Sequence, residues 1–162
     1  DGIEGDIAVK RGSASMMIGY WNRPEATDEK FRGDWMLTGD RGQWEGGYLR
    51  FVGREDDVIT SAGYRIGPAE IEDCLLRHPS VAMAAVIGVP DPLRTEAVQA
   101  HVVLKTGALA TESDLQTHFR TRLSAHLVPR VIRFETELPM TVTGKIIRKE
   151  IKRTATLKGV TP

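Results

Sequence analysis

Three short stretches of this chain contain residue types that could bind a nucleotide or act on a phosphate. They are LTGD at residues 37–40, GREDDVITSAGYRIG at residues 53–67, and TVTGKIIRK at residues 141–149. In the first stretch, the carboxylate of Asp40 could accept hydrogen bonds from two vicinal hydroxyl groups, as the acids that bind ribose do. Read alone, however, a Gly-Asp pair after an apolar run is more often only a turn.

The second stretch combines arginines with a glycine that precedes a tyrosine. Arg54 and Arg65 carry guanidinium groups, whose fork of donors suits hydroxyls and phosphates. Gly63 has no side chain, so the backbone can approach a ligand closely at this position. Read alone, the stretch could equally be a solvated linker.

The third stretch places a lysine directly after a glycine. Gly144 predicts a mobile backbone, and Lys145 contributes a compact positive charge. Such a lysine is usually only solvated, but it could neutralise a carboxylate and a phosphate that meet at close range. Two unit charges about 4 Å apart gain on the order of 4 kcal/mol at an effective dielectric constant near 20, so one lysine can change a rate strongly.

The composition excludes several broad classes of function. The chain has 162 residues, of which 22 are Lys or Arg and 22 are Asp or Glu, so its formal net charge is zero. A neutral chain has no overall field that would attract nucleic acid or an anionic membrane. No apolar run approaches the roughly 18–20 residues that a membrane span requires, and no signal-peptide pattern is present.

Cysteine and histidine usage argues against a disulfide framework and a metal centre. The single cysteine, Cys74, lies between apolar residues at a helical position, so we expect it to be buried and the protein to be cytoplasmic. The histidines stand apart from one another and form no ligand cluster, so no metal site is predicted. These histidines are His78, His101, His118 and His126.

The pattern of apolar residues predicts an α+β protein with two parts. The first part, residues 1–55, is β-rich, and the second, residues 56–162, alternates helical and strand patterns. Its order of helix, strand, strand, helix, strand favours a two-layer domain, with a three-stranded sheet and helices on one of its faces. Helices are expected within 67–79, 111–127 and 144–153, and strands within 80–90, 96–105 and 130–139. Thr111 and Asp114 are predicted to cap the second helix.

The order of these motifs resembles the C-terminal end of the adenylate-forming (AMP-binding) superfamily, and most of all its acetyl- and medium-chain acyl-CoA synthetases. The resemblance covers essentially the whole chain. Because the chain begins with Asp1 rather than Met, we expect it to be the tail of a longer protein. The matching motifs are GYWNRPEAT, FRGDWMLTGD, GYLRFVGREDDVITSAGYRIGPAEIE, HPSVAMAAVIGVPDPLR, EAVQAHVVL and ELPMTVTGKIIRKEI.

The resemblance implies a role for each candidate residue. Asp40 is similar to the acid that binds the ribose hydroxyls of ATP, and Arg54 to the arginine that contacts the same nucleotide. Lys145 is similar to the lysine required for adenylation, and Asp56 occupies the hinge position. Three further residues match the loop that lines the coenzyme A site: Gly63, Tyr64 and Arg65.

The resemblance also implies a reaction with two half-steps. A small carboxylic acid attacks ATP, with Mg²⁺ and Lys145 offsetting the charge, and coenzyme A then attacks the acyl-adenylate after the small domain rotates about Asp56. Residues 1–55 would be the β-rich, barrel-like end of a large N-terminal domain, and residues 56–162 a mobile lid. The phosphate loop, the acyl pocket and most of the Mg²⁺ site would belong to the N-terminal remainder, so the fragment alone would be inactive.

Two alternatives remain open from the sequence. The chain could be a non-catalytic binding or regulatory module with the same fold. It could also belong to an adenylating enzyme that loads the thiol of a carrier protein instead of coenzyme A.

Overall fold

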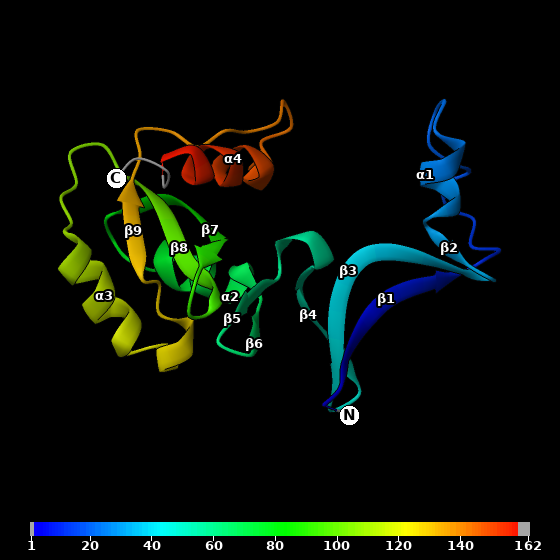
Figure 1. The fold of residues 1–162 in the computed structure, drawn as a ribbon, viewed down its shortest axis with the longest axis horizontal. Helices are drawn as coiled ribbons and strands as arrows, with labels where there is room; N and C mark the ends of the chain where they lie inside the picture. Colours follow the sequence, from blue (N-terminus) through cyan, green and yellow to red (C-terminus); the bar gives the residue numbers. More distant parts are fainter. Residues whose placement is uncertain (1, 159–162) are drawn as a thin grey trace. The chain divides into compact units, whose positions relative to one another are not determined.

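The computed structural model describes residues 2–158. The chain divides into two compact units, Asp1–Asp56 and Asp57–Pro162. Figure 1 shows that strands dominate the first unit, whereas the second combines strands with three helices, α2, α3 and α4. The predicted α+β class is confirmed.

The first unit is built on a four-stranded antiparallel sheet. Its long strand β3 lies between β1 and β4, and the short β2 pairs with the beginning of β3. The described strands form an open sheet, so the barrel-like closure predicted for this part is not seen among them. The elements are β1 (Glu4–Lys10), α1 (Pro24–Asp28), β2 (Phe31–Arg32), β3 (Trp35–Glu45) and β4 (Tyr48–Arg54).

The second unit contains a five-stranded sheet, so the prediction of three strands was wrong. Strands β7, β8 and β9 occupy the predicted stretches, with β7 antiparallel and β9 parallel to β8. The two missed strands, β5 and β6, form a hairpin of three-residue strands, which is too short to show an alternating apolar pattern. The strands are β5 (Ile59–Ser61), β6 (Tyr64–Ile66), β7 (Val81–Asp91), β8 (Thr95–Leu104) and β9 (Val131–Phe134).

Helices cover both faces of this sheet, whereas the sequence predicted helices on one face only. Val86 of β7 packs in one apolar cluster with residues of α2 (Pro68–Leu76) and α3 (Glu112–Arg120). Ala85 and Ile87 pack in a second cluster with Ile151 of α4 (Arg148–Lys158). Because successive side chains of a strand point to opposite faces, the two clusters lie on opposite sides of β7. The unit therefore has three layers.

The ends of the helices follow their local sequence. Pro68 opens α2, and the predicted capping box of Thr111 and Asp114 at the start of α3 is confirmed. The last helix begins only at Arg148, so Lys145 precedes it instead of lying on it. Two short 3-10 turns, η1 (Glu55–Asp57) and η2 (Ala125–Leu127), complete the described elements.

The packing of His78 predicts acid sensitivity. Burial and then the neighbouring His118, whose ring centroid is 5.1 Å away, lower the pKa of His78 from 6.5. The unfolded chain then binds the proton more readily, so this stabilisation is present above pH 6.5 and is lost as the pH falls through the lower folded-state pKa. We expect the melting temperature to fall between pH 7 and pH 5.

Thermal denaturation across this pH range checks the expectation. The control is His78→Asn, which keeps an acceptor for the backbone N–H of Ser80 that donates to His78 Nδ1 at 3.2 Å, but does not titrate. The variant should show a flatter pH dependence. An unchanged slope would assign the acid sensitivity to other groups.

Candidate functional site

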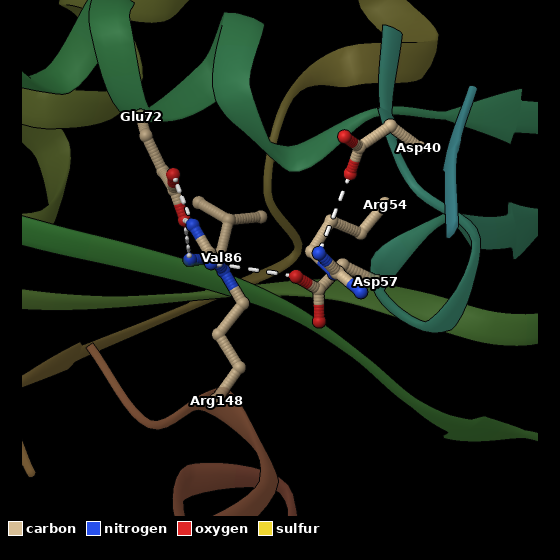
Figure 2. Close-up of polar contacts among 6 residues, drawn as sticks. All are labelled: Asp40, Arg54, Asp57, Glu72, Val86 and Arg148. Atoms are coloured by element: carbon tan, nitrogen blue, oxygen red, sulfur yellow. Dashed lines mark hydrogen bonds and ion pairs between the residues drawn. The ribbon is translucent and has the colours of Figure 1, made fainter. Parts of the chain in front are cut away.

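Asp40 and Arg54 lie on paired strands in the first unit. They are direct partners in the register of β3 with β4, and Arg54 Nη1 lies 3.4 Å from Asp40 Oδ1 (Figure 2). The backbone N–H of Asp40 donates to Thr38 Oγ1 at 3.0 Å, and this hydroxyl donates to the carbonyl of Ile7 at 2.9 Å. These hydrogen bonds fix the backbone at Asp40. The Asp40 side chain stays 33% exposed, and the Arg54 side chain stays 50% exposed. A ligand can reach both groups.

A second cation, which sequence reasoning missed, lies beside this pair. Gly39 has φ +81°, and a Cβ added there would lie 3.0 Å from Arg54 Nη2 and 3.2 Å from Lys30 Nζ. The glycine therefore leaves room for two positive groups next to Asp40. A hollow of about 470 Å³ adjoins them, lined by Arg23, Lys30, Arg32 and Gly39, and also by Glu29 and Glu55. The sequence offered no signal for Lys30, because one lysine before a two-residue strand has no distinctive pattern.

Gly63, Tyr64 and Arg65 form one arm and the tip of the β5–β6 hairpin in the second unit. Ala62 and Gly63 occupy the turn with φ +50° and +84°, a combination typical of a type I′ turn. Nothing lies within 4 Å of a Cβ added at Gly63, so the tip is open. Tyr64 stacks on the ring of His126 at a centroid distance of 4.3 Å. The predicted loop is thus the turn and second strand of a tight β-hairpin.

Lys145 is exposed and lies at the end of a tight turn. The N–H of Gly144 donates to the carbonyl of Thr141 at 2.9 Å, and the N–H of Thr141 donates to the carbonyl of Lys145 at 2.8 Å. The N–H of Lys145 also donates to Thr141 Oγ1 at 3.0 Å. Gly144 supplies φ +80° for this turn. The prediction of a mobile backbone at Gly144 is therefore replaced by a hydrogen-bonded turn that presents the lysine.

Three charged residues of the second unit form a cluster that sequence reasoning missed. Arg148, the first residue of α4, pairs with Glu72 of α2 at 2.7 Å and with Asp57 at 3.4 Å (Figure 2). Glu72 is only 9% exposed and also accepts from the backbone N–H of Val86 at 2.8 Å. The sequence did contain a signal for this cluster. Arg148 lies at a helix N-terminus, where a positive charge opposes the helix dipole, so carboxylates are expected nearby.

The predicted site residues fall into both units. The structure brings Asp40 together with Arg54, and it places Gly63, Tyr64 and Arg65 on one hairpin. Lys145 belongs to a separate turn of the second unit. Asp56 is the last residue of the first unit and lies within η1.

A cavity of about 520 Å³ lies apart from the predicted residues. It is bounded by parts of β8, β9 and α4, and none of the predicted site residues lines it. A chain of polar groups lies in its wall, with Gln99 Nε2 2.8 Å from His101 Nε2 and His101 Nδ1 2.9 Å from Glu135 Oε1; Gln99 and His101 are buried and Glu135 is partly exposed. Because these groups satisfy one another, their arrangement does not by itself indicate a ligand.

Within residues 2–158, no group of three or more His, Cys, Asp or Glu side chains could hold a metal ion. Among the described helices, none is long and apolar enough to cross a membrane.

Comparison with known proteins points to one family. The AMP-binding enzyme C-terminal domain matches residues 70–145. The human mitochondrial acyl-coenzyme A synthetase ACSM1 is 43% identical over 162 residues, which is 94% of this chain and 28% of that protein. Acetyl-coenzyme A synthetase of Bacillus subtilis is 41% identical over 91% of this chain and 27% of its own length. The chain thus spans less than a third of these relatives.

Solved structures agree with this assignment. The anthranilate CoA ligase AuaEII, in complex with anthranoyl-AMP, matches 99% of this chain and 31% of its own, with a TM-score of 0.89 and 34% identity. ATP-bound MatB from Rhodopseudomonas palustris matches 96% of this chain and 31% of its own, with a TM-score of 0.84 and 32% identity. Residues 70–145 thus match the AMP-binding enzyme C-terminal domain, and nearly the whole chain is similar to part of each of these synthetases and ligases.

Proposed function

We propose that the chain is the C-terminal part of an ATP-dependent acyl-CoA synthetase. The protein would convert a carboxylic acid and ATP to an acyl-adenylate and pyrophosphate, and then transfer the acyl group to coenzyme A with release of AMP. The observation that carries the proposal is the exposed Asp40–Arg54 pair, in a chain that is 43% identical to an acyl-coenzyme A synthetase. The relatives solved with ATP and with anthranoyl-AMP support a nucleotide at such a site.

In the first half-reaction, Asp40 binds the ribose hydroxyls and Arg54 contacts the same nucleotide. The acid substrate and the α-phosphate are both anionic, so their approach is opposed by charge. Lys145, exposed at the end of its turn, offsets this repulsion as negative charge gathers in the transition state. Mg²⁺ would shield the departing pyrophosphate when bound by the remainder of the N-terminal domain, and the described residues add no cluster for it.

In the second half-reaction, the lid formed by residues 56–162 turns about Asp56. The division of the chain into compact units directly after this residue supports a joint there. The open tip at Gly63, with Tyr64 and Arg65, then guides the thiol of coenzyme A. Residues 1–55 stay with the large domain. A cytoplasmic location stays a prediction, since relatives include mitochondrial enzymes.

The test uses the full-length protein that contains this chain. Over a panel of carboxylic acids, we expect acid-dependent exchange of pyrophosphate into ATP, and acyl-CoA when coenzyme A is added. An absence of exchange with every acid would favour the non-catalytic module. Exchange followed by loading of a phosphopantetheinyl carrier protein, but not of coenzyme A, would favour the carrier-loading alternative.

Gly39 offers a sharper test of the nucleotide site. Gly39→Ala should cost about 1–2 kcal/mol of folding free energy, because alanine is strained at φ +81°. It should also displace Arg54 and Lys30 and weaken AMP binding about tenfold or more, by isothermal titration of the full-length protein. The matched control is Gly33→Ala, with φ +59° but nothing within 4 Å of the added Cβ. Equal losses of AMP affinity in both variants would contradict this assignment.

A further inference from the structure

We infer that Arg148 is a positioning residue for Lys145. The inference rests on the proposed function, and it concerns the cluster of Arg148, Glu72 and Asp57, to which neither the family match nor the resemblance assigns a role. Arg148 lies three residues after Lys145 and begins α4. It is therefore the first charged residue beyond the turn that presents the lysine, and its contacts determine where that turn is anchored.

The contacts of Arg148 use all three of its guanidinium nitrogens. Nη2 donates to both oxygens of Glu72, at 2.7 Å and 2.9 Å, and Nε lies 3.3 Å from Glu72 Oε1. Nη1 lies 3.4 Å from Asp57 Oδ2. A forked, planar donor group fixes direction as well as distance, which a lysine ammonium cannot do. Figure 2 shows Arg148 reaching from the start of α4 towards both carboxylates.

The two carboxylates that Arg148 contacts connect it to other parts of the unit. Glu72 is held by the backbone N–H of Val86 in β7, the strand that packs against helices on both of its faces. Asp57 is the first residue of the second unit and directly follows Asp56, the proposed joint. The cluster therefore connects the base of the Lys145 turn to the core of the sheet and to the first residue after the joint.

The turn that carries Lys145 is supported from its other side as well. The N–H of Ile147 donates to the carbonyl of Pro139 at 2.8 Å, and Met140 forms a bridge with Ile146. Ile146 also packs against the apolar cluster of α4 and β7. With Arg148 in place, Lys145 moves with the whole unit. When the unit rotates about Asp56, any movement of the turn relative to the joint would displace the Lys145 ammonium.

The sequence supports a purpose beyond stability for this arginine. A positive charge in the first turn of a helix opposes the dipole, so Arg148 breaks a local rule. Local rules are broken mostly where function requires it. A group that acts only through placement should affect the step that uses Lys145 and spare the step that does not.

The experiment measures both half-reactions of the full-length protein with Arg148→Lys, which keeps the charge and loses the fork. We expect kcat for pyrophosphate exchange to fall about tenfold with KM for ATP nearly unchanged, and thioester formation from supplied acyl-adenylate to change less than about threefold. The matched control is Lys149→Ala, an exposed cation on the same helix, which should leave both rates unchanged.

Each outcome either supports or overturns the positioning role of Arg148. Equal loss in both half-reactions, or none, overturns the positioning role. If Arg148→Lys does not fold, Asp57→Asn keeps the Arg148–Glu72 pair and should give a smaller loss, about threefold, in pyrophosphate exchange only. Unaltered kinetics of that variant would overturn the inference. A wild-type protein without any exchange would refute the proposed function itself and this inference with it.

Discussion

Replacing Lys145 with alanine should slow acyl-adenylate formation by about 100- to 1,000-fold, the usual cost of removing one group that stabilises charge in a transition state. Lys145 is exposed and its backbone is held in a hydrogen-bonded turn, so the substitution should remove the charge without disturbing the fold. Thioester formation from supplied acyl-adenylate should continue at close to its normal rate, because the proposed second step uses the Gly63 hairpin instead. Pyrophosphate exchange and coenzyme A release assays on the full-length protein measure the two steps separately.

Two controls make this result specific. Lys149→Ala removes a nearby exposed charge outside the turn and should be neutral in both assays. Thr141→Val removes the hydroxyl that accepts from the N–H of Lys145 and keeps the lysine, so it should give an intermediate loss in the first step only. If Lys145→Ala slowed both half-reactions equally, the lysine would not have the role given to it here.

Much of the candidate site could be predicted from the sequence because its residues occur in short, distinctive motifs. Asp40 and Arg54 were predicted to contact one nucleotide. That role stays a prediction, and the strands that carry the two residues place them directly opposite each other. The helices α2 and α3 were predictable because Pro68 and the Thr111 capping box mark their starts. Local signals of this kind do not depend on the rest of the fold.

What the sequence did not predict depends on tertiary contacts. The β5–β6 hairpin is stabilised by pairing of Ser61 with Thr95 on β8, which three-residue strands do not reveal. The layer formed by helix α4 was missed. Its signal was present in the run of Ala85, Val86 and Ile87, because a strand buried on both faces reads as continuously apolar. Lys30 was missed because one lysine before a two-residue strand has no distinctive pattern. Glu72 was missed because its partner Arg148 lies 76 residues away in the sequence.

The cluster around Arg148 leads to the largest expected effect on stability. Glu72→Ala should destabilise the second unit by about 3–5 kcal/mol, because it leaves the guanidinium of Arg148 without its main partner in a largely buried place. The N–H of Val86 also loses the carboxylate that accepts from it. For a domain of roughly 100 residues, such a loss lowers the melting temperature by more than about 10 °C, measurable by calorimetry.

A double-mutant cycle separates the pair from the packing of each side chain. If most of the cost comes from the unpaired charge, the double variant Glu72→Ala with Arg148→Ala should lose much less stability than the sum of the two single variants. The contact with Asp57 is longer, at 3.4 Å, so Asp57→Asn should lower the melting temperature far less than Glu72→Ala does. Strict additivity of the Glu72 and Arg148 variants would mean that the pair itself contributes nothing, and that the base of the Lys145 turn is held by its backbone hydrogen bonds and apolar packing.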